Sequence, residues 1–154
     1  MTATIISAFP CCGKSYLVKN NNTGKRLLDL ESSYFSWMMS HGSKIRNPDF
    51  PNNYMDEINK HIEEYDYIFV SSHISVRTAL HDHHIPYILV YPENTPDCYQ
   101  AWKARCYDRG TKTLWDTILS LNWNSLLHSC LLDNFAKKHI RLNSNMYISN
   151  IVEN

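Results

Sequence analysis

The sequence predicts a doubly wound α/β fold with a mostly parallel sheet of five strands. Short apolar runs alternate along the chain with stretches of helical periodicity, which is typical of parallel strands joined by helices. The run Tyr67–Ser72 is continuously apolar over its first four residues, as expected of a strand that is covered on both faces. A tight loop at 8–15 joins the first apolar run to a helix, and this strand–loop–helix unit is typical of the same fold class.

The expected element boundaries follow from periodicity and from turn residues. Tyr54, Ile58 and Ile62 share one helical face, and Pro96 suits the first turn of a helix that Gly110 ends. Residues 40–53 are rich in Gly, Asn, Pro and Ser, so we expect a mobile excursion there. Strands are expected at 4–9, 26–30, 67–72, 87–91 and 140–142. Helices are expected at 13–20, 51–65, 75–83, 95–110, 111–121 and 123–138, with a helical tail at 146–152.

Composition indicates one compact domain over residues 1–154. With 154 residues, 44% of them hydrophobic, the chain can build a sizeable core. The formal net charge is zero and the pI is near 7.1, so the chain lacks the overall basic character of many nucleic-acid-binding domains. This overall balance does not rule out basic patches on parts of the surface. No apolar run approaches the roughly 20 residues of a membrane span, and no signal peptide is evident. We therefore expect a cytoplasmic protein with no membrane partner.

The five cysteines are expected to be free thiols, because an odd count in a cytoplasmic protein argues against a disulfide framework. Cys11 and Cys12 are adjacent, which is not the C-x-x-C spacing of a zinc site. A helix N-terminus lowers the pKa of a nearby thiol, so a reactive cysteine is one interpretation of this pair. The interpretation we prefer is that both residues simply fill the loop.

The stretch from Ala8 to Ser15 matches the phosphate-binding loop pattern G-x-x-x-x-G-K-[ST], except that alanine replaces the first glycine. Such a loop closes on a helix N-terminus, where several backbone N–H groups hold phosphate oxygens. Gly13 lets the backbone approach the phosphate, Lys14 can reach the β- and γ-phosphates, and Ser15 can place its hydroxyl on Mg²⁺. We therefore expect a nucleotide triphosphate to bind to Ala8, Phe9, Pro10, Cys11, Cys12, Gly13, Lys14 and Ser15.

Further polar residues follow the other predicted strands. Asp29 and Glu31 end the second apolar run, and Ser71, Ser72 and His73 end the third. In doubly wound sheets, ligands bind beyond the carboxyl ends of the strands. We therefore expect these side chains, together with the segment from Pro92 onward, to gather near the loop at one edge of the sheet.

These motifs resemble those of P-loop kinases of the nucleoside and nucleotide kinase group, and look most like a small branch found in bacteriophage genomes. The resemblance runs nearly from end to end of the chain. It implies ATP-dependent phosphoryl transfer, with ATP and Mg²⁺ as cofactors and a nucleoside or nucleotide as acceptor. The stretches that carry the resemblance are 8–15, 29–37, 47–54, 69–73 and 90–92.

The resemblance also implies roles for single residues. Asp29 matches the acid that, in such kinases, orients the acceptor hydroxyl, takes its proton or binds Mg²⁺ through water. Arg77 lies where nucleotide kinases often grip a phosphate, so it joins the expected cofactor-binding residues. Arg105 and Arg109, four apart on one helix, are placed like lid arginines. The expected catalytic residues are Lys14, Asp29, Arg105 and Arg109.

Two departures from the kinase pattern keep other interpretations open. Ala8 replaces the usual glycine, and no acid follows Ser72, where many P-loop enzymes hold an aspartate that orders Mg²⁺. One alternative is a non-catalytic phage factor that sequesters a nucleotide or binds a host protein; the missing acid favours it, and the intact Lys14–Ser15 pair opposes it. Another alternative is a kinase of hydroxymethylated bases in DNA, which the neutral pI disfavours because duplex binding calls for a basic face.

Overall fold

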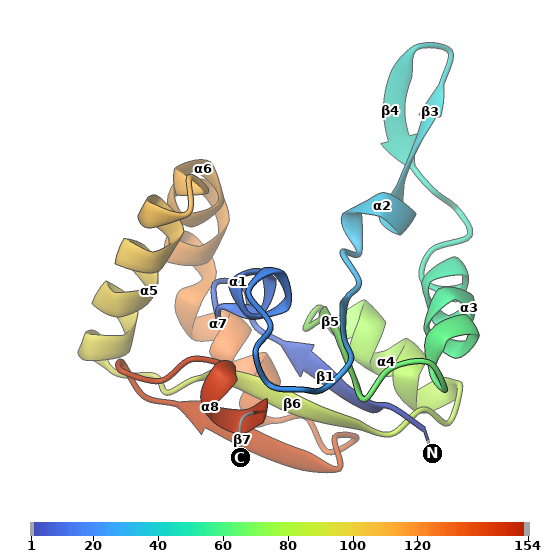
Figure 1. Cartoon of the computed structure of the whole chain (residues 1–154). Coiled ribbons are helices and arrows are strands. Elements are labelled where there is room, and N and C mark those ends of the chain that lie inside the picture. The colour runs from blue at the N-terminus through green and yellow to red at the C-terminus, as the bar shows by residue number, and fades with distance from the viewer. Residues whose placement is uncertain (1, 153–154) are drawn as a thin grey trace.

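A parallel sheet of five strands forms the centre of the computed structural model, which describes residues 2–152 (Figure 1). The strand order is β2-β5-β1-β6-β7, so the strand that leads into the loop at 8–15 lies in the middle. All four pairings within the sheet are parallel. The five strands are β1 (Thr4–Ala8), β2 (Leu27–Asp29), β5 (Tyr67–Ser71), β6 (Tyr87–Pro92) and β7 (Lys138–Leu142).

The three central strands are apolar because both faces of the sheet are covered. Most residues of β1, β5 and β6 are buried, whereas the edge strands β2 and β7 are only partly so. The sheet is flanked by helices, an arrangement compatible with the predicted doubly wound fold. The five parallel strands are confirmed.

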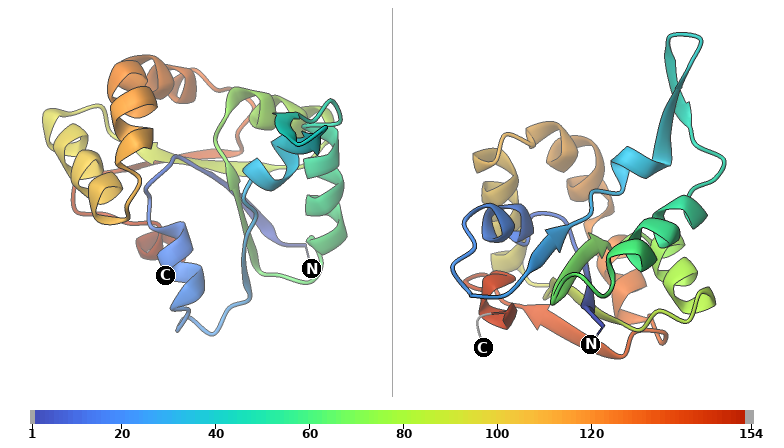
Figure 2. Two further views of the ribbon diagram at one scale, coloured as in Figure 1. Left: turned by 90° about the horizontal axis from the view of Figure 1, so that it is seen from above. Right: turned by 45° about the vertical axis from the view of Figure 1, so that its right-hand side comes forward.

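Helices α5, α6 and α7 lie on one side of α1, and α2, α3 and α4 lie on the other (Figures 1 and 2). No helix within residues 2–152 is long and apolar enough to cross a membrane. The helices are α1 (Lys14–Lys19), α2 (Ser33–Ser36), α3 (Asn52–His61), α4 (Ile74–Asp82), α5 (Pro96–Asp108), α6 (Lys112–Leu114), the π-helical turn η1 (Trp115–Leu119), α7 (Ser120–Leu131) and α8 (Ser149–Val152).

An aromatic cluster joins the group of helices α5–η1–α7 to the loop after β1. The Trp123 ring has its centroid 5.8 Å from that of Phe9 in the loop and 5.6 to 6.5 Å from three other rings. Buried aromatic side chains contribute both apolar area and favourable edge-to-face contacts. This cluster therefore fixes the position of α5 and α7 beside the loop. The three other rings belong to Tyr99, Trp102 and Trp115.

The excursion expected at 40–53 does leave the body of the protein, but its first half belongs to a β-hairpin instead of an irregular loop. Strands β3 (Trp37–Ser40) and β4 (Ser43–Arg46) pair antiparallel and project from the body (Figure 1). His41 and Gly42 both have positive φ, 51° and 79°. Two such residues form the tight turn whose twist matches a hairpin, and an X-Gly pair between two strand-forming runs was the sequence signal for it.

The expected helix at 123–138 ends early, and the expected break near 122 is absent. Helical structure runs from Lys112 through Leu131 without interruption. The chain then turns because Asp133 Oδ1 accepts hydrogen bonds from the backbone N–H groups of Phe135 and Ala136, both at 2.8 Å. Such local capping by an aspartate competes with helix hydrogen bonding. Strand β7 consequently begins earlier than predicted, at Lys138.

Candidate functional site

Three hydrogen bonds from neighbouring segments fix the backbone of the loop between β1 and α1. Phe9 N–H donates to Val90 O at 2.9 Å. The Trp102 indole N–H donates to Pro10 O at 3.0 Å, and Ile148 N–H donates to Cys12 O at 2.9 Å. The loop is therefore preorganised by β6, α5 and the C-terminal segment together.

Gly13 ends the loop in a conformation that other residues rarely adopt. Its φ is 90°, and a Cβ built on it would lie 3.1 Å from Tyr147 Cδ1. Any other residue would thus meet both backbone strain and a close contact. This agrees with the requirement, deduced from the motif, for a glycine directly before Lys14.

Asp29, at the end of β2, lies against the first two residues of α1. Ser15 Oγ donates to Asp29 Oδ2 at 2.9 Å, and Lys14 Nζ lies 3.9 Å from Asp29 Oδ1. Within residues 2–152, Asp29 Oδ1 is buried without a hydrogen-bond partner. This oxygen faces the Lys14 ammonium at 3.9 Å but accepts no hydrogen bond, and a buried carboxylate oxygen without one is costly, so the arrangement favours a further positive ligand.

The Ser15–Asp29 pair fits Mg²⁺ by its chemistry. Mg²⁺ prefers oxygen ligands and usually keeps several waters, with one or two carboxylates and substrate phosphates completing its shell. No cluster of three or more His, Cys, Asp or Glu residues able to hold a metal occurs in the described part of the chain. A metal at this place would therefore be held by few protein oxygens, as Mg²⁺ at a phosphate site is.

A cavity of about 320 Å³ opens beside Lys14, at the carboxyl ends of β1 and β5. One wall is polar and includes Glu31 and His73, and the opposite wall is apolar. The volume lies at the lower end of the range for small-molecule sites. The predicted gathering of the loop, Glu31 and the residues after β5 at one sheet edge is thus observed. The apolar wall comes from α6, η1 and α7 and consists of Leu114, Ile118, Leu119 and Leu126.

A scan against protein-family models and a search of curated proteins both found no match for the chain. The resemblance to P-loop kinases therefore rests on the residues of the sequence motifs alone.

His73 lies at the polar edge of the cavity, and its pKa is lowered from the usual value. The main cause is loss of hydration, and the positive charges of Arg46, Arg77 and Lys14 add to it, against an opposing effect of Glu31. The imidazole is therefore neutral at pH 7. Arg46 belongs to β4, so the hairpin contributes to the lowered pKa of His73.

Arg77 was expected to bind a phosphate, but its guanidinium is occupied inside the protein. The residue is 4% exposed, and its Nε donates to Ser72 O at 2.8 Å. One terminal nitrogen donates to Asp133 Oδ2 at 2.8 Å, and the other donates to Ser129 Oγ at 2.7 Å. These contacts favour a structural role, in which Arg77 ties α4 to α7 beneath the cavity.

Arg105 and Arg109 were expected to act together, but the structure separates them. The Arg105 guanidinium lies between the rings of Trp102 and Tyr147, at 4.0 and 3.9 Å. It also donates to the carbonyl oxygens of Ser144 and Met146, at 3.1 and 2.8 Å. Arg105 therefore fastens the C-terminal segment to α5. Arg109, at the end of α5, is exposed and lines the cavity.

The expectation of five free thiols is wrong for two of them. Cys11 in the loop and Cys106 in α5 form a disulfide, with their Cα atoms 6.0 Å apart and a sequence separation of 95. Cys12, Cys98 and Cys130 are free and buried. The pairing follows from the fold of α5 over the loop, which sequence spacing does not reveal. Burial raises the pKa of Cys12 to about 12, so this neighbouring thiol is unreactive.

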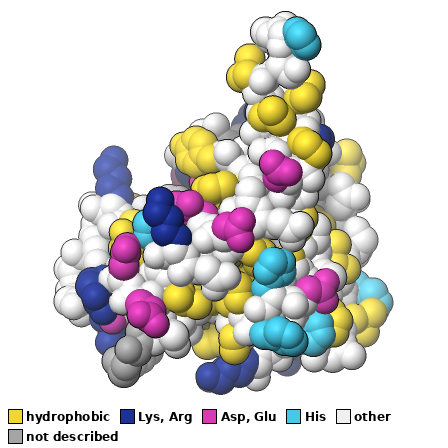
Figure 3. Space-filling model, turned by 90° about the vertical axis from the view of Figure 1, so that its right-hand side faces the viewer, with side chains coloured by type: hydrophobic (Ala, Val, Ile, Leu, Met, Phe, Trp, Pro, Cys, Tyr) yellow, Lys and Arg dark blue, Asp and Glu magenta, His cyan; other side chains and the backbone are white. Residues whose placement is uncertain are grey.

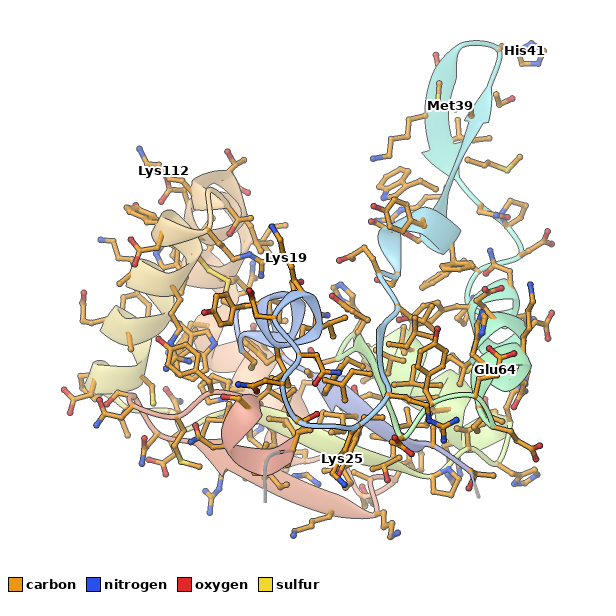
Figure 4. The ribbon with its side chains drawn as sticks, in the orientation of Figure 1. Lys19, Lys25, Met39, His41, Glu64 and Lys112 are labelled. Atoms are coloured by element: carbon orange, nitrogen blue, oxygen red, sulfur yellow. A yellow bond between two sulfur atoms is a disulfide. The ribbon has the colours of Figure 1, made fainter. Side chains whose placement is uncertain are left out.

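The β3–β4 hairpin carries a local basic surface that the neutral overall charge concealed. Arg46 Cζ lies 4.0 Å and Lys44 Nζ 4.8 Å from the centre of the Trp37 ring. No acidic residue occurs between Trp37 and Arg46. Figure 3 shows hydrophobic side chains on the hairpin as well, and Figure 4 places Met39 and His41 at its far end. The hairpin therefore presents basic and apolar side chains together, a surface that the sequence interpretation missed.

Proposed function

We propose that the protein is an ATP-dependent phosphotransferase whose acceptor, a nucleoside or nucleotide, binds in the cavity beside Lys14. The observation that carries the proposal is the group formed by Lys14, Ser15 and Asp29 at the end of a preorganised loop. A phosphate on the loop would meet a cation, a hydroxyl and a carboxylate. Phosphoryl transfer depends mainly on such positioning and charge stabilisation.

The positions of Asp29 and Glu31 favour different roles, one at the phosphate donor and one at the acceptor. Asp29 contacts Ser15 and Lys14, so it belongs to the phosphate side, where with Ser15 it would hold Mg²⁺. Mg²⁺, when bound, neutralises charge on the phosphates. Glu31 is exposed at the cavity and is the better candidate to accept the acceptor's proton. Arg109 can approach the transferred phosphate from the opposite wall.

Replacement of Lys14 tests the proposal most directly. Lys14→Ala removes the cation that faces the β- and γ-phosphates, and a charged hydrogen bond of this kind is worth about 10- to 100-fold in affinity. Lys19→Ala, at the exposed end of the same helix, is the matched control. Calorimetry with Mg·ATP should show weaker binding for Lys14→Ala only. Equal affinity of a folded Lys14→Ala protein would refute the phosphate-loop assignment.

Transfer of labelled γ-phosphate to nucleosides and monophosphates identifies the acceptor. Binding of ATP without transfer to any acceptor would point instead to the non-catalytic nucleotide-binding factor. The structure weakens that alternative, because Asp29 places an acid beside Ser15 although no acid follows Ser72.

A second candidate function is phosphorylation of hydroxymethylated bases in DNA, and the basic hairpin favours it. Lys44 and Arg46 can neutralise phosphodiesters near the cavity, since Arg46 acts on His73 at its edge. The variant Lys44→Ser/Arg46→Ser should lower transfer to modified DNA and leave transfer to nucleosides unchanged. The control Lys137→Ser/Lys138→Ser removes two exposed charges at the start of β7, on the far side of the body (Figure 1). Equal loss in both double variants would contradict a role for the hairpin.

A further inference from the structure

The disulfide between Cys11 and Cys106 joins the phosphate loop to the helix that carries Arg109. Cys11 has a φ of 63° at the bend of the loop, and Cys106 lies one turn before Arg109 in α5. Both residues are buried, at 3% and 0% exposure. The bond is thus the covalent link between the proposed phosphate site and a wall of the cavity.

We propose that Cys11 and Cys106 form a thiol–disulfide modification site that controls how freely the end of α5 moves over the phosphate loop. This inference rests on the proposed function, because the consequence of the bond is control of nucleotide exchange. An enzyme that closes over its phosphates must also open to release them. With the bond in place, the end of α5 cannot leave the loop; with the bond reduced, it can.

Among the described residues, few contacts besides the bond hold the end of α5 to the loop itself. Arg109 approaches Cys11 Sγ at 3.9 Å, and residues 107–110 are exposed, although Tyr107 Oη donates to Asp116 Oδ1 of η1 at 2.9 Å. The earlier part of α5 stays anchored, because Trp102 is fully buried and donates to Pro10 O. Reduction is therefore expected to free the end of α5 about Trp102 without unfolding the helix.

The other cysteines do not compete for this exchange. Cys12, Cys98 and Cys130 are buried, and burial raises the pKa of Cys12 to about 12 and of Cys130 to about 11. The thiolate is the form that attacks a disulfide, so these thiols react slowly. In a reducing compartment, disulfides that do occur are mostly transient or redox-sensing, which fits a switch better than a permanent support.

The chemistry of the switch needs an external dithiol. One thiolate of the dithiol attacks Cys11 Sγ, on the less buried of the two residues, forming a mixed disulfide with Cys11 and releasing the Cys106 thiolate. The second thiol of the dithiol then attacks the mixed disulfide and displaces the Cys11 thiolate. Two electrons and two protons pass to Cys11 and Cys106, and the dithiol becomes a disulfide. Oxidation by a small disulfide runs the same steps in reverse.

Peptide mapping without reductant, together with nucleotide release, tests the inference. Oxidised protein should yield a linked Cys11–Cys106 peptide and three free thiols. Release of a fluorescent ATP analogue, followed by stopped flow, should be about tenfold faster after treatment with dithiothreitol. Cys106→Ser should release at the faster rate under both conditions, and Cys98→Ala, on the same helix, should behave like the wild type. Five free thiols in oxidised protein, or equal release in both states of the wild type, would overturn the inference.

Hydrogen exchange separates failure of the switch from failure of the proposed function. If the ATP analogue binds neither the oxidised nor the reduced protein, the proposed function fails. The hydrogen-exchange rate across residues 103–110 still shows whether the disulfide restrains the end of α5. Faster exchange on reduction of the wild type, with no change in Cys106→Ser, supports the link independently of nucleotide. Equal exchange in both states of the wild type, a comparison that requires no variant, contradicts it.

Discussion

Asp29 and Glu31 are two residues apart, yet they meet different chemical groups. Asp29 accepts a hydrogen bond from Ser15 beside Lys14, and Glu31 reaches the cavity. The two acids are thereby suited to different tasks, one at the phosphates and one at the acceptor. Substitutions that keep shape and remove charge can distinguish these tasks.

We expect Asp29→Asn to raise the Mg²⁺ concentration needed for half-maximal turnover, with activity partly restored at high Mg²⁺. Glu31→Gln should lower turnover by roughly 10²–10⁴-fold at every Mg²⁺ concentration, as loss of a general base does. Steady-state rates measured over a Mg²⁺ series distinguish the two. If Glu31→Gln stays within a few-fold of wild type, the acceptor's proton goes elsewhere, and His73 becomes the next candidate.

His61 and His73 should contribute to stability with opposite pH dependence. Hydrogen bonding to Glu64, together with Glu57, raises the pKa of His61, so its contribution is present below about pH 6.5 and is lost as the pH rises through the folded value. The pKa of His73 is lowered, so its contribution is present above about pH 6.5 and is lost as the pH falls.

Urea unfolding at several pH values checks this prediction. Acidification should reduce the free energy of unfolding less in His73→Gln than in the wild type. In His61→Gln the same acidification should reduce it more. Parallel pH profiles for the two variants would show that neither histidine titrates differently in the folded state.

At the scale of elements, α5 combines a structural arginine with an exposed one at its end. Arg105 stacks on two aromatic rings and holds two carbonyl oxygens of the C-terminal segment, whereas Arg109 borders the cavity. Arg105 therefore holds the C-terminal segment in place, and Arg109 is available to contact a ligand in the cavity.

Lysine at either position keeps the charge and loses the planar guanidinium, so the two variants should differ in what they damage. Arg105→Lys should lower the free energy of unfolding by about 1–3 kcal/mol, through lost stacking and hydrogen bonds. Arg109→Lys should leave stability unchanged and lower turnover by about 10²–10³-fold, as loss of a donor to developing charge does. Unfolding curves and single-turnover rates measure these effects. Full activity of Arg109→Lys would make this arginine a solvated side chain.

At the scale of the whole molecule, a buried ion pair connects α4 to the turn after α7. The side chains of Arg77 and Asp133 are 5% and 2% exposed, and Tyr87 Oη also donates to Asp133 Oδ2 at 2.6 Å. Burial by itself would raise the pKa of Asp133, but the hydrogen bonds from Tyr87 and Arg77 outweigh it and lower the pKa. Arg77 lines the cavity, so the pair fixes this part of its wall.

Removal of one partner should leave an uncompensated buried charge. We expect Arg77→Met to lower the free energy of unfolding by about 3–5 kcal/mol, as breaking a buried pair does. Arg26→Ala removes half of an exposed pair with Asp66 and should cost less than about 1 kcal/mol. Urea titrations of both variants provide the measurement. An equally small effect in both would indicate that Arg77 remains free to serve a ligand.

The sequence by itself determined what depends on neighbouring residues. Hydrophobic periodicity located the five strands, and the spacing Gly13-Lys14-Ser15 after the first strand located the loop. Because the carboxyl ends of parallel strands meet at one edge of the sheet, Glu31 and His73 were expected near Lys14. These inferences succeed because strand burial, turn conformation and sheet handedness are imposed locally and repeat along the chain.

Only the tertiary structure decided which distant side chains meet. It joins Cys11 to Cys106 in a disulfide, places Arg77 in an ion pair with Asp133, and holds Arg105 against the C-terminal segment. Each of these contacts joins segments tens of residues apart, and each depends on how α5 and α7 pack around Trp102 and Trp123. Spacing along the sequence carries no information on such contacts, because the packing of large side chains in three dimensions selects them.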